Sequence, residues 1–368
     1  MHLADIATSI FAGLGLTEVY DSGGFGESPH GRECLLLVDG LGADVISKYE
    51  EFAPTLSKLT FLSPVLTAFP STTATSLTTL MTGTLPGTHG MLGYTVRIPR
   101  SGGRILNSLK WDERVDAHNW QPVPTLFERG NAAGISVSHI ASKRYEKTGF
   151  TEAAFRGATY RGANTLPEMV EEAKIALTST PSFVYLYLND LDVAGHAAGV
   201  GSEKWLLALA FVDHAVSALL DQLPTGTRFW LTSDHGMVNV EEKIVLGRDN
   251  SLLDGISLVA GEPRARHLYL EDHFLTGSGP NEVAENWRNS LGELVDVFTR
   301  QEAIDENLFG LFVSNDASDR MGDLVVITRG GLILIDPLRV DLESKMVGHH
   351  GALTDAEKLV PLGFALIS

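Results

Sequence analysis

Cysteine is almost absent from this chain. Its 368 residues include one cysteine, Cys34, which lies inside the apolar run ECLLLV. A single cysteine excludes a disulfide framework within the chain, and it also excludes a metal site built from several thiolates. We therefore expect Cys34 to be a buried core residue.

Positive charge is also scarce. The chain has 28 lysines and arginines against 46 aspartates and glutamates, which gives a formal net charge of −18. Broad binding of polymeric nucleic acid needs a basic face and is therefore excluded. An anionic substrate would need local positive charge, for which bound metal ions are the most direct source.

Long hydrophobic runs are missing as well. No uninterrupted apolar run approaches the ~20 residues that span a bilayer. The first residues, MHLADIATSIFAGLGL, have neither the basic region nor the long apolar segment of a secretory signal. We therefore expect no membrane span and a cytoplasmic location.

What the sequence does contain is a set of short apolar runs separated by helical patterns. Three of them, ECLLLVDG, SFVYLYLND and RFWLTSDHG, are typical of strands that are buried on both faces. Hydrophobic residues make up 44% of the chain and charged residues 20%, enough for a large core. The alternation predicts an α/β fold with a mostly parallel central sheet.

The spacing of these patterns changes along the chain. After about residue 240, strand-like segments alternate with helical ones at shorter intervals, which indicates a smaller α+β subdomain inserted before the chain returns to the core. We predict a core formed by 31–245 and 346–368, an inserted subdomain at 250–345, and an N-terminal helix and loop at 1–30.

Aspartates follow each of the three buried runs. Asp39 ends the first, Asp190 and Asp192 follow the second, and Asp234 ends the third. In open α/β sheets, ligands bind beyond the carboxyl ends of the strands, so these carboxylates are expected at one edge. A structural alternative is that each aspartate caps the next helix. Helix capping explains one such aspartate well, but it explains less well why aspartates follow all three buried strands.

Histidines accompany two of these aspartates. His196 lies four residues after Asp192, so both share one face of a helical turn, whereas Asp190 is six residues away. His235 directly follows Asp234, and a His349-His350 pair lies near the C-terminus. Carboxylates and imidazoles together suit zinc, and also manganese or iron. These aspartates and histidines are numerous enough to bind two metal ions. A two-metal site holds both the attacking and the leaving oxygen of a phosphoryl displacement.

A threonine-rich segment, FPSTTATSLTTLMTGT, occupies residues 69–84. It begins like a helix at Pro70 and Ser71 and ends like one at Gly83, although threonine is a mediocre helix former. The threonines could bond their own backbone. Alternatively, one hydroxyl near the helix N-terminus could be a nucleophile.

The ordered set VDG, PSTTATSLTTLMTG, DVAGH, SDHGM and HHG resembles the alkaline phosphatase superfamily, and within it the nucleotide pyrophosphatase/phosphodiesterase branch. The order and spacing of five motifs make the resemblance specific. It covers residues 34–237 and the tail from residue 346. It implies an alkaline-phosphatase-like three-layer sandwich and a metal-dependent hydrolase that acts on phosphoric diesters or nucleotide pyrophosphates.

The resemblance also assigns roles to residues. The family's nucleophile lies nine residues before the threonine of a T-G pair, which selects Thr73 before Thr82, with Thr72 as the alternative. His350, which directly precedes Gly351 as the family's ligand precedes a glycine, is preferred over His349. The implied metal ligands are Asp192, His196 and His350 for one ion, and Asp39, Thr73, Asp234 and His235 for the other.

One position departs from the family pattern. Many relatives have H-G-x-x-G-N after the nucleophile helix, and the asparagine contacts the substrate phosphate. This chain has HGMLGY, with Tyr94 at that position. We predict that Tyr94 binds substrate together with Thr73, through its hydroxyl or by stacking on a base.

The implied reaction is a two-step hydrolysis of a small, nucleotide-like phosphoester through a phospho-threonine, assisted by two divalent ions. The alternatives are a phosphomonoesterase, a phosphonate hydrolase, or a catalytically inactive metal- or nucleotide-binding member. The core motifs contain no arginine or lysine that could hold the second charge of a monoester, which favours diesters. Four basic residues in the intervening regions bear on that argument: Arg97, Arg104, Lys143 and Arg144.

Overall fold

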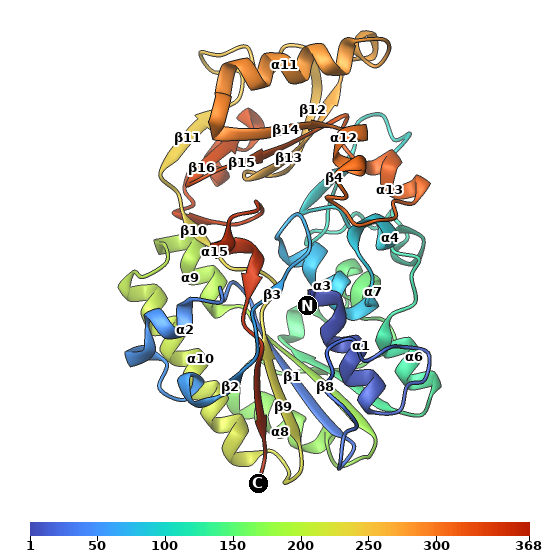
Figure 1. The fold of residues 1–368 in the computed structure, drawn as a ribbon, viewed down its shortest axis with the longest axis vertical. Coiled ribbons are helices and arrows are strands. Elements are labelled where there is room, and N and C mark those ends of the chain that lie inside the picture. Colours follow the sequence, from blue (N-terminus) through green and yellow to red (C-terminus); the bar gives the residue numbers. More distant parts are fainter.

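A mostly parallel seven-stranded sheet forms the centre of the larger part of the protein, in the lower half of Figure 1. The structure is a computed structural model and describes residues 1–368. The strand order is β2-β19-β9-β1-β8-β6-β7, and the five strands from β9 to β7 are parallel. At the other edge β19 is antiparallel to both of its neighbours. The strands are β1 (Arg32–Val38), β2 (Thr60–Phe61), β6 (Ser136–Ala141), β7 (Thr159–Gly162), β8 (Ser182–Leu188), β9 (Arg228–Thr232) and β19 (Gly363–Leu366).

Helices cover both faces of this sheet. Along β1, Leu35 and Leu37 belong to one hydrophobic cluster, whereas Cys34 and Leu36 belong to another. This alternation follows from the two-residue period of a strand and confirms the prediction of strands buried on both sides. The first cluster is covered by α1 (Leu3–Gly13), α3 (Thr73–Thr82), α6 (Leu126–Ala132) and α7 (Gly149–Phe155), and the second by α2 (Val45–Lys48), α8 (Leu166–Ala176), α9 (Asp190–Ala198) and α10 (Glu203–Gln222).

Helix α10 is the one helix that is long and apolar enough to cross a membrane by length and composition. Its inner face lies in the second cluster through Trp205, Leu209 and Val216. The Asp213 side chain on this helix accepts hydrogen bonds from the N–H groups of Thr55 and Leu56. The core helices of proteins pass the same length and composition test.

A smaller antiparallel sheet with its own hydrophobic core lies at the opposite end of the molecule, beneath helix α11 (Figure 1). This is the α+β pattern expected after residue 240. Strand β11 (Glu242–Val245), which precedes the predicted subdomain, pairs with β16 (Leu332–Ile335) inside it. The smaller sheet consists of β12 (Ile256–Glu262), β13 (Ala265–Leu270), β15 (Leu324–Thr328) and β14 (Val295–Thr299), covered by α11 (Gly279–Leu291).

Short elements complete the chain between and around the two sheets. Strands β10 (Val238–Asn239) and β17 (Gly348–His349) pair where the chain leaves the core and returns to it. The others are β3 (Val65–Leu66), α4 (Pro86–His89), β4 (Thr95–Arg97), β5 (Ile105–Asn107), α5 (Ala117–Trp120), α12 (Arg300–Asp305), α13 (Asn315–Arg320), α14 (Val340–Glu343), α15 (Asp355–Lys358) and β18 (Leu359–Val360).

Candidate active site

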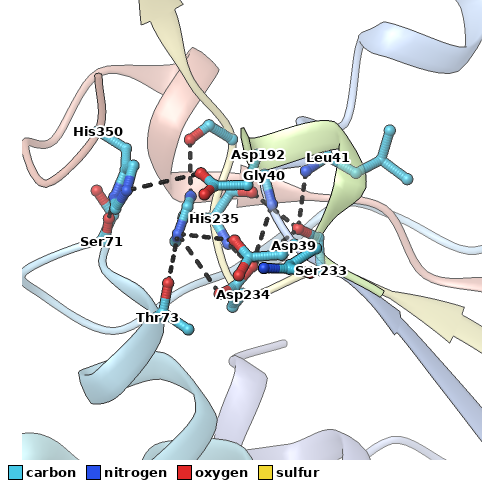
Figure 2. A network of polar contacts seen from close by, with 12 residues as sticks. Asp39, Gly40, Leu41, Ser71, Thr73, Asp192, Ser233, Asp234, His235 and His350 are labelled. Carbon is cyan, nitrogen blue, oxygen red and sulfur yellow. Dashed lines mark hydrogen bonds and ion pairs between the residues drawn. The ribbon is translucent and has the colours of Figure 1, made fainter. Parts of the chain in front are cut away.

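The seven residues predicted as metal ligands lie together at the carboxyl edge of the large sheet. Asp39, Asp192, Asp234 and their neighbouring histidines follow strands of the large sheet, whereas Thr73 and His350 come from other segments. The set consists of Asp39 after β1, Thr73 at the start of α3, Asp192 and His196 on α9 after β8, Asp234 and His235 after β9, and His350 after β17. Figure 2 shows five of them, Asp39, Thr73, Asp192, Asp234 and His350, around the ring of His235.

Thr73 is the first residue of α3, directly after its N-cap residue Thr72. No side chain caps this end, so the N–H groups of the first turn are free to hold an anion. At the other end, Gly83 adopts the left-handed conformation (φ 66°) that commonly ends a helix. The threonine-rich segment is therefore a buried helix whose N-terminus opens on the site.

Several of the remaining threonines bond their own backbone, as one interpretation of the segment proposed. The hydroxyl of Thr78 donates to the Ala74 carbonyl at 2.8 Å, and that of Thr82 to the Thr78 carbonyl at 2.8 Å. Both interpretations of the segment thus apply, to different residues. Thr73 faces the site, whereas Thr78 and Thr82 satisfy their hydroxyls within the helix.

A first group of ligand atoms surrounds Nε2 of His235. This nitrogen lies 3.2 Å from the Thr73 hydroxyl, 3.3 Å from Asp39 Oδ1 and 3.4 Å from Asp234 Oδ2 (Figure 2). Ligand atoms of Asp39, Asp234 and His235 all lie within 4.8 Å of one another. This spacing is compatible with one metal ion.

A second group lies next to the first. Ligand atoms of Asp192, His235 and His350 also lie within 4.8 Å of one another, so His235 belongs to both groups. His350 stacks on His235 with 3.5 Å between the ring centroids. His196 Nε2 lies 3.4 Å from Asp192 Oδ1, but His196 is in neither group. The ligand sets predicted from the sequence differ from these groups. They placed His196 with Asp192 and His350, and they gave His235 only to the other metal ion.

The hydrogen bonds of the histidines prepare their Nε2 atoms as ligands. Nδ1 of His196 lies 2.9 Å from the Gly348 carbonyl, Nδ1 of His235 lies 3.0 Å from the Gly236 carbonyl, and Nδ1 of His350 lies 2.8 Å from the Ser71 carbonyl. A carbonyl can only accept, so each Nδ1 carries the proton and each Nε2 keeps its lone pair. This is the usual arrangement of metal-binding histidines.

The carboxylates give the same indication. Asp39 Oδ1, Asp192 Oδ1 and Asp234 Oδ2 are buried and have no hydrogen-bond partner. Buried polar atoms normally have a hydrogen-bond partner, and the binding of an ion accounts for such exceptions. The donor set of carboxylate oxygens and imidazole nitrogens therefore fits divalent metal ions.

Burial and mutual repulsion dominate the electrostatics of these groups. Burial raises the pKa of Asp39 well above its usual range, and the neighbouring Asp234 and Asp192 raise it further. The pKa of Asp234 is raised by burial and partly lowered again by His235. Burial and then the adjacent His235 hold the pKa of His350 well below its ordinary value, so this imidazole is neutral and able to bind a metal. Cations between the carboxylates would relieve their repulsion.

Tyr187 supports the site from β8, and sequence reasoning missed it. Its hydroxyl donates a hydrogen bond to Asp39 Oδ2, whereas His235 pairs with the other oxygen, Oδ1. The identity of strand residues alone does not say which aromatic hydroxyl reaches a ligand. The parallel register places Tyr187 opposite Leu37 of β1, two residues before Asp39, and so near that carboxylate.

We expect Tyr187→Phe to weaken metal binding by about 10–100-fold, the usual effect of removing a group that orients a ligand. Tyr185→Phe is the matched control, because Tyr185 lies two residues earlier on the same strand and its buried hydroxyl has no partner. Metal affinity is measured by competition with a chromogenic chelator. Equal losses in the two variants would contradict a specific role for the Tyr187–Asp39 bond.

A cavity of about 130 Å³ opens beside Thr73, Asp39 and Asp192. Its lining contains no arginine or lysine, and aromatic rings form much of its wall: His139, Tyr145, Phe150, Phe155 and Tyr187. The remaining lining residues are Leu77, Leu109, Thr148, Thr151 and Asn189. The cavity is therefore suited to a flat, apolar group attached to a phosphate.

The basic residues of the intervening regions do not line this cavity. Arg97 lies over the Tyr269 ring, Arg104 pairs with Asp112, and Lys143 lies 3.6 Å from Glu168. Arg144 stacks on Tyr145 and lines a neighbouring cavity. None of the four is in the lining of the cavity beside Thr73, and the preference for diesters over monoesters stays a prediction.

Two other sequence-based candidates lie away from this cavity. Tyr94 is half-buried and is absent from the lining, and its N–H donates to Glu262 Oε2 at 3.0 Å. His349 is buried with its Nε2 unpartnered, and it belongs to neither ligand group. The substrate-binding role of Tyr94 stays a prediction.

Solved structures share this fold over most of their length. Murine ectonucleotide pyrophosphatase/phosphodiesterase 5 superposes with a TM-score of 0.71 and 17% identity, and the match covers 90% of this chain and 87% of that one. An inactive threonine-to-alanine variant of the same protein, in complex with AMP, gives a TM-score of 0.70. The alkaline-phosphatase-like arrangement expected from the sequence is thus confirmed as the fold.

Sequence comparisons point the same way. Family member 1 of the ectonucleotide pyrophosphatase/phosphodiesterases from Rattus norvegicus is 25% identical over 225 residues, 55% of this chain and 24% of the rat protein. An uncharacterized pyrophosphatase/phosphodiesterase of Schizosaccharomyces pombe is 25% identical over 59% of this chain and 47% of its own length. The chain thus spans less than half the length of these relatives. The sequence model of the type I phosphodiesterase / nucleotide pyrophosphatase family matches residues 34–353, and the chain belongs to this family, within the alkaline phosphatase superfamily.

Proposed function

We propose that the chain is a two-metal phosphodiesterase or nucleotide pyrophosphatase that works through a phospho-threonine on Thr73. The observation that carries the proposal is the position of the Thr73 hydroxyl. It lies at the free N-terminus of α3 and 3.2 Å from Nε2 of His235, the residue shared by both ligand groups. A hydroxyl in this position lies next to the side chains that would bind the metal ions and next to the free N–H groups that would bind the phosphate.

In the first step the Thr73 oxygen attacks phosphorus, the bond to the leaving oxygen breaks with its electron pair, and the hydroxyl proton passes through solvent to the leaving alcohol or phosphate. In the second step water attacks phosphorus, the bond to the Thr73 oxygen breaks, and a proton of that water restores the Thr73 hydroxyl as phosphate monoester is released. Divalent ions, zinc by donor set with manganese or iron as alternatives, supply Lewis acidity to the hydroxyl, the water and the phosphate oxygens when bound.

The residues of the chain perform the remaining work. Asp39, Asp192, Asp234, His235 and His350 would hold the ions, with His196 beside Asp192. The N–H groups of the first turn of α3 are directed at the charge that develops on the phosphate oxygens. Burial of Asp39, Asp234 and His235 excludes water from the ligands, which strengthens these interactions.

A nucleotide-like substrate is supported by two observations. The aromatic wall of the cavity, which includes Tyr145, Phe150 and Phe155, offers flat faces on which a base could lie. The structural relative described above binds AMP in its inactive variant. The absence of basic side chains from the cavity favours a singly charged diester or pyrophosphate linkage over a monoester.

The decisive experiment compares hydrolysis of bis(p-nitrophenyl) phosphate, p-nitrophenyl phosphate and phosphonoacetate by purified protein supplied with zinc or manganese. Faster turnover of the diester, lost with EDTA, supports the proposal. Faster turnover of the monoester or of phosphonoacetate would instead assign the site to a phosphomonoesterase or a phosphonate hydrolase. No turnover and no retained metal would indicate an inactive binding protein.

A further inference from the structure

Glu262 is a buried carboxyl that the mechanism above does not use. It is the last residue of β12 in the smaller sheet, and its side chain is 2% exposed. From there its carboxyl contacts the Tyr94 N–H and the Thr72 hydroxyl. It is therefore a direct link between the smaller sheet and the segments that carry the nucleophile and a metal ligand.

Three separate segments meet this side chain. Its Oε2 accepts a hydrogen bond from the Tyr94 N–H at 3.0 Å, and the Thr72 hydroxyl faces the same carboxyl. A Cβ added to Gly93 would lie 3.2 Å from Oε2, and one added to Gly351 would lie 2.7 Å from the Glu262 Cγ. Gly351 has φ 130°, so it could not carry a side chain without strain in any case.

Two of these contacts lie one residue from the reacting machinery. Thr72 directly precedes Thr73, and Gly351 directly follows His350. Ser71 joins the same two segments, because its hydroxyl donates to the Ala352 carbonyl and its own carbonyl accepts from His350 Nδ1. Glu262 packs against Thr72 and Gly351, the neighbours of Thr73 and His350. It therefore helps to set the position of Thr73 relative to His350.

The bonding of Glu262 is unlike that of the structural glutamates nearby. Glu357 forms a two-fold ion pair with the buried Arg264, and Glu343 pairs with the buried Arg266. Glu262 has no such partner, and its Oε1 is buried without any hydrogen bond. Burial also raises the pKa of this carboxyl to about 8, so it is largely neutral at pH 7.

We propose that Glu262 is a positioning residue that fixes the N-terminal end of α3, and with it Thr73, against the segment that carries His350. The inference rests on the proposed function for its kinetic readout. Glu262 does not line the cavity beside Thr73, so it acts through Thr72 and Gly351 and not on substrate.

The test compares Glu262→Ala, Glu262→Gln and Val259→Ala under saturating zinc. Val259 lies on the same strand and packs against the core of the smaller sheet, so its truncation controls for loss of stability. We expect Glu262→Ala to lower kcat about 10–100-fold with KM changed less than about threefold, as befits misplacement of a reacting group. Glu262→Gln keeps an oxygen that accepts from Tyr94 and should recover at least about a third of kcat.

Binding of orthovanadate, measured by calorimetry, provides a second readout that needs no turnover. We expect its affinity to fall at least about tenfold in Glu262→Ala and to be unchanged in Val259→Ala, with zinc stoichiometry equal in all variants. Wild-type kcat and vanadate affinity in Glu262→Ala, losses equal to those of Val259→Ala, or loss of zinc would each overturn the inference. A wild-type protein that turns over no substrate contradicts the proposed function alone, and the vanadate comparison then decides the role of Glu262.

Discussion

Replacement of Thr73 by alanine is expected to lower kcat/KM for a phosphodiester by about 10⁴-fold or more, as loss of a nucleophile commonly does. Thr73 is the hydroxyl at the start of α3 and lies 3.2 Å from Nε2 of His235. Alanine removes the attacking oxygen and leaves the helix intact. The measurement is the initial rate with bis(p-nitrophenyl) phosphate, with the melting temperature recorded to show that the fold is unchanged.

Thr72 supplies the matched control. It is the N-cap of α3, yet its side chain makes no capping hydrogen bond, so its truncation costs little helix stability. We expect Thr72→Ala to lower kcat/KM by no more than about 100-fold, as Glu262→Ala does, because it removes the hydroxyl that faces Glu262 and leaves the attacking oxygen in place. Thr73→Ser should retain measurable activity, since serine still offers a hydroxyl. Trapping of a phosphoryl group by acid quench, followed by peptide mass spectrometry, should locate it on Thr73. A phosphoryl group trapped on Thr72 would assign the nucleophile to Thr72 instead. An active Thr73→Ala variant would show that Thr73 is not the nucleophile.

Much of this arrangement could be predicted from the sequence because its signals are local. Three apolar runs indicate strands buried on both faces: ECLLLVDG, SFVYLYLND and RFWLTSDHG. Parallel strands bring their carboxyl ends to one edge of the sheet. Asp39, Asp192 and Asp234 therefore had to lie near one another once the fold class was known. The four-residue spacing of Asp192 and His196 likewise placed them on one face of α9, with Nε2 and Oδ1 3.4 Å apart.

The features that the sequence did not predict depend on contacts between distant segments. Tyr187 reaches Asp39 only because β8 lies beside β1 in the observed register. Glu262 reaches Thr72 and Gly351 across the boundary between the two sheets, and no pattern within β12 indicates it. The sharing of His235 between both ligand groups also follows from loop conformation after β9, which residue spacing does not specify.

The length of α10 illustrates the reverse case, in which composition alone is misleading. Polar residues interrupt the sequence of this helix, so it contains no uninterrupted apolar run of spanning length, yet its length and mean hydropathy pass the test for a membrane span. The face that carries Trp205 and Leu209 lies in the core. The mean hydropathy of a helix does not show which of its faces is buried, whereas the contacts of its side chains do.

The His349-His350 pair permits a second large and discriminating prediction about the metals. We expect His350→Ala to lower activity by about 10³-fold, because a bound ion is worth several kcal/mol of transition-state stabilisation, and to lower the bound zinc stoichiometry by one. His350 donates through Nδ1 to the Ser71 carbonyl and directs Nε2 toward Asp192, 3.8 Å away.

His349 is the matched control because it is adjacent, buried and chemically identical. Its Nδ1 is occupied by the backbone of His350, and its Nε2 lies in neither ligand group. We expect His349→Ala to keep both zinc equivalents and activity within about tenfold, the lower end of effects from groups around a metal site. Metal content is measured by elemental analysis after exhaustive dialysis, and activity removed by EDTA should return with zinc in this variant but not in His350→Ala. Retention of both ions by His350→Ala together with loss of one by His349→Ala would exchange the two assignments, because the histidine that carries the ligand must be the one whose removal opens the site.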